Sequence, residues 1–493
     1  MLVGFVEINN DDTAAWVSIE DVHRSATAVD AKVKAVLGRL LAQRRSAATA
    51  FDYVQALAPG VKANCWSLAE AAGHEGWHRM QAVLGSYRWD WTALRDWLAA
   101  LAEAWLPNDP TDLIGPGLAI DETAQLKHGD ATACVSPQHA GITGKVENCV
   151  TTVFTAYVAT SGQAWVDFDV YLPKRWADNP ARRAAAAVPD ELPMQTKPQL
   201  AIAQLARLMA SGLPIRWVAF DEVYGRSSAL RQACEDHHLP YVAIVPCDFQ
   251  ITTKAGTVLR ADAAVADAVF ERRSAGTGSK GPRYSDWALI ATASEHHHLL
   301  IRRLISRPDQ YTFYLCHAPA DQPATMTFFV TIAGRRWPVE ETFKIGKDVL
   351  GWDSSQARTW TAQCRHTALA ALAQLRQAAI RTSVCGDLPA LPTPQPTPRH
   401  TATPVEHVDD ADLRIPIGDT PIPTHPDQPR PPHLGLIRLT VAETARLTRL
   451  AADWTAGLIT RAHLAFKLRW SARRRRHQAT ARWHHHVTRL ARL

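Results

Sequence analysis

The stretch "GLAIDETAQL", residues 117–126, and the later stretch "IRWVAFDEVYG", residues 215–225, each end a short apolar run in an Asp–Glu pair. One such ending carries little information, because strands commonly finish in polar turn residues as they reach the surface. Two such endings in one chain suggest that acids from both strands share a site. They therefore direct attention to a third acid farther along the chain.

The bulk composition is that of a globular protein. The chain has 493 residues, of which 46% are hydrophobic and 21% are charged, and this length predicts roughly two to four domains. No apolar run is long enough to span a membrane, and the acidic N-terminus is unlike a signal peptide. We therefore expect a cytoplasmic protein that does not bind a membrane.

Cysteine and histidine give little support for a metal site on sequence grounds. The eight cysteines are scattered without a C-x-x-C pair, which argues against a zinc ribbon and a disulfide scaffold. Histidine triplets occur at 296–298 and 484–486. Metal binding there is conceivable, but adjacent histidines on one strand point to opposite faces.

Positive charge is concentrated at the end of the chain. The net charge is +6, yet the stretch Arg461–Leu493 contains nine Arg, one Lys and no acid. Such a segment suits contact with phosphate backbones, with Arg473, Arg474, Arg475 and Arg476 as the central candidates. The alternative is a solvated helix without a specific role.

The predicted elements change in character along the chain. Residues 19–106 have helical spacing, and a pair of short helices that would begin at a Ser67 N-cap resembles a helix-turn-helix or, equally, part of a plain bundle. Between about residues 115 and 250, three strands, a helix, a strand, a helix and a strand follow in order. That order predicts an α/β (α+β) fold whose core is a ribonuclease H-like mixed sheet.

The second half of the chain is predicted to alternate between β-rich, helical and irregular regions. Residues 250–332 look β-rich, including "MTFFVTIAG" near their end, and a helix is expected from Pro338 to about Thr382. Dense prolines between 388 and 433 predict a linker. Beyond it, a capping box starting at Thr440 predicts another helix.

The third acid lies in "RRWPVEETFKIGKDVLGWD", residues 335–353. Pro338 suits the first turn of a helix, where its missing N–H costs nothing. The apolar stripe of this helix consists of Val339, Phe343, Gly346 and Leu350. Glu340 then lies at the edge of the buried face, whereas Glu341 projects about 100° away toward solvent.

The same geometry selects one acid from each Asp–Glu pair. Side chains alternate along a strand, so only one member of each pair can face a shared site. In a ribonuclease H-like sheet the two strands are neighbours, which would place Asp121 beside Asp221 under the helix of Glu340. Each acid alone also has an ordinary structural explanation, as a turn residue or as a first-turn acid favoured by the helix dipole.

Clustered carboxylates repel one another unless a cation neutralises them. Hard oxygen ligands select Mg²⁺, or Mn²⁺ as a substitute, rather than zinc. Two such ions can activate an attacking oxygen and stabilise the leaving oxygen at a phosphodiester. The site therefore predicts a polyanionic substrate.

At this point the chain resembles the DDE transposases of bacterial insertion sequences, whose catalytic domains are ribonuclease H-like. The resemblance covers roughly residues 115–375, and "KANCWSLAEAAG" and the Arg-rich tail also fit it. The matching pieces are "AIDET", "GKVENC", "DVYLPKRWADNPARR", "WVAFDEVYG" and "RRWPVEETFKIGKDVLGWD".

The resemblance implies roles for individual residues. Asp121, Asp221 and Glu340 would bind the catalytic metal ions, and Arg336 and Lys347 would contact DNA phosphates. The family's tyrosine position holds Ala333 here, which puts the role of that tyrosine in doubt. Trp287 could stack on a flipped base, although an ordinary buried tryptophan is the favoured alternative.

The resemblance also implies an organisation and an activity. The partner would be double-stranded DNA, both transposon ends and target, bound by a homodimer or larger assembly near the bacterial nucleoid. Hydrolysis at the transposon end would free a 3′-OH that attacks target DNA. We expect a helical end-binding region at 1–110, a catalytic core at 111–249 and 333–387, a β-rich insertion at 250–332, a linker at 388–433 and a basic helical tail at 434–493.

Three alternatives remain open. The chain could be a retired transposase that binds DNA without cutting it, although all three acids are present. It could be a metal-dependent nuclease without strand transfer, which fits less well with helical regions on both sides of the core. A glycosidase that uses two of the carboxylates would leave the Arg run and Lys347 unexplained.

Overall fold

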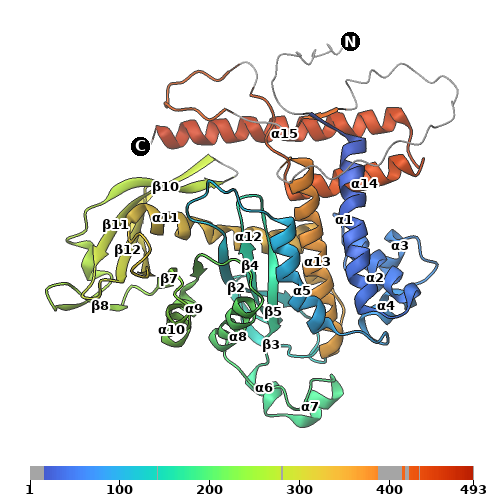
Figure 1. Cartoon of the computed structure of the whole chain (residues 1–493), viewed down its shortest axis with the longest axis horizontal. Coiled ribbons are helices and arrows are strands. Elements are labelled where there is room, and N and C mark those ends of the chain that lie inside the picture. Colours follow the sequence, from blue (N-terminus) through green and yellow to red (C-terminus); the bar gives the residue numbers. More distant parts are fainter. Residues whose placement is uncertain are drawn as a thin grey trace. The chain divides into compact units, whose positions relative to one another are not determined.

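The computed structural model describes residues 16–141, 143–278, 281–386, 414–416, 421–431 and 434–491. Most of the predicted linker at 388–433 lies outside these residues. The chain divides into a larger compact unit, Thr27–Gly278 with Pro282–Leu388, and a smaller one built from both chain ends and Ser279–Gly281. The fold is mixed α/β around one large sheet, so the predicted fold class is confirmed (Figure 1).

The main sheet has ten strands in the order β10-β11-β12-β13-β7-β6-β2-β4-β3, with β5 also paired to β4. A separate hairpin joins β8 (Gln250–Thr252) to β9 (Val258–Arg260). The strands of the main sheet are β2 (Gly117–Leu126), β3 (Ser136–Ala140), β4 (Lys145–Val158), β5 (Gln163–Val170), β6 (Val218–Phe220), β7 (Tyr241–Val245), β10 (Glu271–Gly278), β11 (Gly281–Ala291), β12 (His297–Leu304) and β13 (Arg307–His317).

The centre of this sheet carries the predicted strand neighbours. β2 pairs with β6 in parallel, and β6 pairs with β7 in parallel, while β4 runs antiparallel to both β2 and β5. The first five residues of β2 and all of β6 are buried, as expected of parallel strands covered on both faces. On the other side of β7 from β6, β13 of the β insertion pairs antiparallel with β7. The insertion thus joins the central sheet through β13.

Helices cover both faces of the central strands. α8 (Lys197–Ala210) packs on β4 and β5, where Thr155 donates a 2.6 Å hydrogen bond to Gln204. Phe154 points to the opposite face because side chains alternate along a strand. Its ring stacks on Trp165 at 4.3 Å and lies 5.8 Å from Phe343 of α12 (Trp337–Lys344).

The helix α13 (Trp360–Val384) is buried along almost its whole length between β5 and the N-terminal helices. Several of its buried polar side chains are hydrogen-bonded, as burial favours. Arg376 forms a buried ion pair with Asp30 of α1, at 2.5 and 2.9 Å. Gln374 accepts from the backbone N–H of Trp165 at 2.9 Å and donates to the carbonyl of Thr342 at 2.8 Å, so it joins β5 to α12.

Residues 19–106 are helical, as predicted, but one helix start differs. The N-cap of the third helix is Asn64, whose side chain accepts from the Ser67 N–H at 2.9 Å, so the expected Ser67 cap is wrong. Asn binds the free N–H groups of a helix start as well as Ser does. The helices here are α1 (Ile19–Leu40), α2 (Arg44–Ala56), α3 (Cys65–Ala71), α4 (His78–Leu84) and α5 (Trp91–Trp105).

The insertion contains the expected strands, but its last predicted strand is a helix. Residues Met326–Arg335 form α11, capped by the Thr325 side chain. The apolar residues of this segment fit the buried face of a helix as well as a strand, so their pattern alone does not distinguish the two. The long helix expected from Pro338 is also interrupted. It consists of α12, a π-helical turn Ile345–Val349, a 3-10 turn Trp352–Ser354 and α13.

The remaining short helices of the larger unit connect its strands. They are α6 (Lys174–Ala177), α7 (Pro180–Ala185), α9 (Glu222–Gly225), α10 (Ser228–Asp236) and a 3-10 turn Ala263–Val265.

The described residues of the smaller unit include a two-stranded sheet, the start of α1 and two further helices. β1 (Trp16–Ser18) pairs antiparallel with β14 (Arg414–Pro416). α14 (Val441–Thr455) starts at the predicted Thr440 cap, and α15 (Arg461–Leu490) carries the basic tail. Within the described residues no helix is long and apolar enough to cross a membrane.

Gly225 provides a test of how α9 packs. A Cβ at Gly225 would meet the carbonyl oxygen of Ile244 on β7 far inside contact distance, so backbone must move. We expect Gly225→Ala to lower the free energy of unfolding by about 1–3 kcal/mol, measured by denaturant titration. The control Gly38→Ala has open space in α1 and should stabilise by about 0.5–1 kcal/mol. Equal effects of the two substitutions would contradict this packing.

Candidate active site

Pairing between β2 and β6 brings the two aspartates together. The register aligns Leu118 with Val218 and Ile120 with Phe220. The residues that follow Ile120 and Phe220 on these two neighbouring segments are Asp121 and Asp221. Neighbouring strands lie about 4.8 Å apart. Asp221 also caps α9, accepting from the Val223 N–H at 3.0 Å, which holds its carboxylate at the strand end.

Both aspartates are costly to ionise where they lie. Asp121 is 8% exposed, and burial followed by the Asp221 carboxylate raises its pKa well above the usual value. Burial and then the Glu122 carboxylate raise the pKa of Asp221 to about 6, while Arg336 and backbone N–H groups of α9 oppose the shift. For both aspartates, burial is thus the largest cause of the shift and a neighbouring carboxylate the second.

Arg336 supplies positive charge among these acids. Its guanidinium donates to Asp121 Oδ2 at 3.0 Å and lies 3.6 Å from Glu340 Oε1. Burial alone would lower the pKa of Arg336, but the carboxylates of Asp121, Glu340 and Asp221 outweigh it and raise the pKa. The side chain that was expected to meet a DNA phosphate therefore joins the first and third acids in this structure.

Glu340 reaches the site from the first turn of α12. Val339 and Phe343 are buried beneath the helix, as the apolar stripe predicts, and the Glu340 side chain is 43% exposed. Glu341 instead accepts a 2.8 Å hydrogen bond from Gln163. Of the two adjacent glutamates, it is therefore Glu340 that shares Arg336 with Asp121.

The start of α12 is held in place by the residue before Arg336. Arg335 forms a bidentate ion pair with Asp112, at 2.6 and 2.8 Å, and also donates to the carbonyl of Gly115 at 2.7 Å. These partners lie in the loop that leads into β2. The two consecutive arginines thus attach the α11–α12 junction to the strand of Asp121 and to the loop before it.

Three polar residues beside the acids were missed from sequence. The alternation argument excluded Glu122, yet its charge raises the pKa of both aspartates. Lys197 at the start of α8 donates to Glu122 Oε1 at 2.6 Å. Tyr224 is buried next to it, and burial followed by the Glu122 carboxylate raises the pKa of its hydroxyl. The Asp–Glu repeat was the available signal for Glu122, whereas Lys197 is recognisable only from the fold.

The other expected DNA contacts of the larger unit have different surroundings. Lys347 lies in the π-helical turn, where burial lowers its pKa against the opposing charges of Asp353, Asp348 and Glu340. Trp287 is 1% exposed in β11, and its ring lies 5.9 Å from Tyr314. Its burial favours the structural explanation of this tryptophan over base stacking.

The four arginines of the basic tail are not equivalent. Arg475 is buried and donates to the carbonyl of Ile437 at 2.8 and 2.6 Å. Arg474 pairs with Glu443 of α14 at 2.7 Å. Arg473, Arg474 and Arg476 are exposed on α15. Because Arg474 is held by Glu443, Arg473 and Arg476 are the better candidates for outside contacts.

Asp121, in the middle of β2, and Asp221, directly after β6, offer ligands that suit a hard divalent cation. All the donors are carboxylate oxygens, the ligand type that Mg²⁺ and Mn²⁺ prefer. Burial and neighbouring carboxylates raise the pKa of Asp121 and Asp221 although Arg336 opposes the shift, and a bound cation would oppose it further. Asp121, Asp221 and Glu340 are therefore the residues that would hold such an ion.

Comparison with known proteins gives one family match. The family described as DDE superfamily endonuclease matches residues 36–287, just over half of the chain. None of the curated proteins searched matches the sequence. Among solved structures, a piggyBac transposase synaptic complex with hairpin DNA is similar with 10% identity and a TM-score of 0.32, over 55% of this chain and 48% of that one.

Replacing Asp221 with Asn should stabilise the protein while removing an acid of the site. The folded-state pKa of about 6 exceeds the unfolded value of about 3.9, so ionised Asp221 opposes folding above about pH 6. We expect Asp221→Asn to raise the free energy of unfolding by about 1–3 kcal/mol near neutral pH in chelator. Asn retains the capping oxygen.

The pH dependence distinguishes this effect from a general gain in packing. The gain should shrink as the pH falls from about 6 and vanish below about 4, where wild-type Asp221 is protonated in both states. Denaturant titrations over this range measure it. Glu222→Gln is the matched control, because Glu222 is exposed and pairs with Arg226. A gain for Asp221→Asn that persists at low pH would contradict the electrostatic cause.

Proposed function

We propose, because this chain belongs to the DDE superfamily of endonucleases, that it is a DNA transposase that cleaves transposon ends and transfers the freed 3′-OH into target DNA. The observation that carries this proposal is the shared site of Asp121, Asp221 and Glu340. Asp121 lies on β2, Asp221 directly follows the neighbouring parallel strand β6, and Glu340 lies on α12. This is the order of the family's acidic triad. Glu340 lies outside the matched region, so its place rests on the shared contact with Arg336.

A divalent cation, Mg²⁺ or Mn²⁺, would supply the positive charge that polarises the phosphodiester and lowers the pKa of the attacking hydroxyl. The chain's own residues prepare the site. Asp121 is held by strand pairing and Asp221 by its cap of α9, and α12 brings Glu340 to the Arg336 side chain that also binds Asp121. Arg336 holds positive charge beside Asp121 and Glu340, where it favours a bound phosphate.

The proposed reaction consists of two displacements at phosphorus. Water first attacks the phosphodiester at the transposon end, the P–O3′ bond breaks, and the 3′-oxygen leaves as the hydroxyl of the element. That 3′-OH then attacks a target phosphodiester, losing its proton as the target P–O3′ bond breaks. Both steps exchange one P–O bond for another and need no energy-rich co-reactant.

The second candidate is a DNA-binding protein derived from a transposase. The ion pair between Arg336 and Asp121 favours it, because an acid bound by an arginine is not free to hold a metal ion. The two candidates differ in whether the protein cuts the DNA that it binds.

Cleavage of labelled duplex DNA that carries the element's own ends tests the proposal. With Mg²⁺ or Mn²⁺ the wild type should nick at the ends, and Asp121→Asn, Asp221→Asn or Glu340→Gln should lower the rate by about 10³-fold or more. Glu341→Gln is the matched control, since its side chain contacts Gln163 instead, and it should retain the wild-type rate.

Two outcomes would overturn this assignment. Binding of the ends without cutting under either metal would favour the DNA-binding alternative. Cutting that depends on Glu341 and not on Glu340 would show that α12 presents the other glutamate. Joining of labelled ends to a supercoiled plasmid, measured in the same reactions, separates a transposase from a nuclease without strand transfer.

Exposed arginines of α15 are proposed to contact DNA phosphates. Replacing Arg473 and Arg476 by Ala should weaken binding of any duplex and reduce the slope of log affinity against log salt by about 2, because each phosphate contact contributes about 1. Fluorescence anisotropy across a salt series measures both quantities. Arg260→Ala, an exposed arginine paired with Asp262, is the control, and an equal change in that variant would contradict a specific role of α15.

A further inference from the structure

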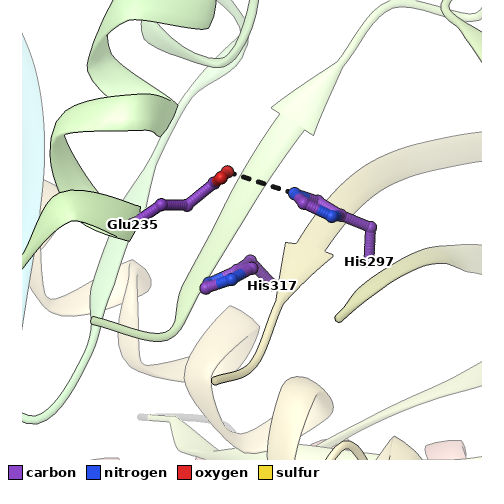
Figure 2. A group of neighbouring side chains, drawn as sticks. All are labelled: Glu235, His297 and His317. Carbon is purple, nitrogen blue, oxygen red and sulfur yellow. Dashed lines mark hydrogen bonds and ion pairs between the residues drawn. The ribbon is translucent and has the colours of Figure 1, made fainter. Parts of the chain in front are cut away.

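A second group of potential metal ligands lies away from the carboxylate site. Glu235 of α10, His297 at the start of β12 and His317 at the end of β13 direct side chains toward one another, as Figure 2 shows. One ligand atom from each lies within 4.8 Å of the other two. His297 Nε2 is 3.1 Å from Glu235 Oε1. This convergence of three elements is the first requirement of a metal site.

Each of the three side chains is oriented by a further hydrogen-bonding partner. The Tyr241 hydroxyl donates to Glu235 at 2.9 Å. Ser294 Oγ lies 2.9 Å from Nδ1 of His297, and Nδ1 of His317 lies 3.4 Å from the carbonyl oxygen of Leu239. Metal-binding histidines and carboxylates are commonly oriented by such partners. A His317 Nδ1–H that donates to a carbonyl leaves the lone pair on Nε2.

Burial and access also suit a bound ion. His317 is buried, while the side chains of Glu235 and His297 are 24% and 26% exposed, so an ion could enter from solvent.

The cluster is separate from the proposed catalytic acids. His317 pairs with Tyr241 at the start of β7, and Tyr241 aligns with Val218 at the start of β6. Asp221 follows the other end of β6, three residues later, which corresponds to about 10 Å along a strand. The histidines therefore lie near the opposite end of these neighbouring strands from Asp221.

We propose that Glu235, His297 and His317 form a zinc site that ties the β insertion to the catalytic core. Two imidazoles and one carboxylate are a donor set that zinc accepts, with a fourth position left for water. Imidazole ligands favour zinc over Mg²⁺, so this site and the carboxylate site select different ions. The proposal is independent of the proposed function.

The bound ion would stabilise a particular junction. Glu235 belongs to the core helix α10, whereas His297 and His317 begin and end the paired strands β12 and β13 of the insertion. An ion bound to all three would join these elements directly. Because such binding exists only in the folded state, it adds to the free energy of unfolding.

Zinc binding by the full-length protein tests the proposal. After dialysis against chelator, the protein is titrated with Zn²⁺ in excess Mg²⁺, which keeps the carboxylate site occupied. We expect the wild type to hold one more zinc ion per chain than His297→Gln by mass spectrometry of metal content. Loss of a ligand should weaken binding by more than about 100-fold, since even outer partners contribute about 10–100-fold.

Neighbouring residues provide matched controls. His298→Gln should bind zinc like the wild type, because His298 lies on the other face of β12, 5.6 Å from the ring of Phe329. Glu235→Gln keeps a hydrogen-bonding side chain and tests a second ligand if His297→Gln folds poorly. Zinc should raise the melting temperature of the wild type and His298→Gln, but not of the two ligand variants.

Two results would overturn the zinc site. One is equal zinc content in the wild type and the ligand variants, which would assign the bound zinc to other histidines, such as those of the tail. The other is a wild type whose melting temperature does not change when zinc is added.

Discussion

The repulsion between clustered carboxylates is the constraint on which this structure depends. Asp121 and Asp221 are brought together by the pairing of β2 with β6, and their pKa values rise because burial and neighbouring charges oppose ionisation. Arg336 relieves part of this cost by pairing with Asp121. A folded chain would not accumulate these charges for stability alone, since uncompensated buried acids destabilise it. The arrangement is better explained by a site that binds a cation, whose positive charge would offset these carboxylates.

The position of Glu340 beside Arg336 and Asp121 depends on α12, which is held from two sides. On one side, Arg335 and Arg336 attach the helix start to Asp112 and Asp121. On the other, Gln374 of the buried helix α13 donates to the carbonyl of Thr342. The second contact explains why a polar residue is tolerated in the centre of α13, because its amide satisfies backbone groups of both β5 and α12.

Much of the core could be predicted because its signals are local. Period-two strands, the strand order and the buried stripe of α12 all follow from side-chain alternation and helical spacing. The errors arose where tertiary contacts decide. Residues Met326–Arg335 have the β-branched and aromatic composition of a strand, yet they form α11 because that helix packs against β6, β7 and β10. Glu122 was excluded by strict alternation, yet its charge still acts on both aspartates, because electrostatic repulsion reaches beyond the face on which a side chain lies.

The β insertion contributes directly to the geometry of the site. It extends the central sheet, since β13 pairs with β7, and the chain then returns through α11 to the residues that carry Arg336 and Glu340. On β12, His298 faces Phe329 of α11, whereas the adjacent His297 faces Glu235 of the core. The start of β12 therefore contacts both the core helix α10 and α11, the helix that precedes Arg336 and Glu340. A contact that holds β12 against α10 would thereby help to fix where α11 begins, and with it the position from which Glu340 reaches the aspartates.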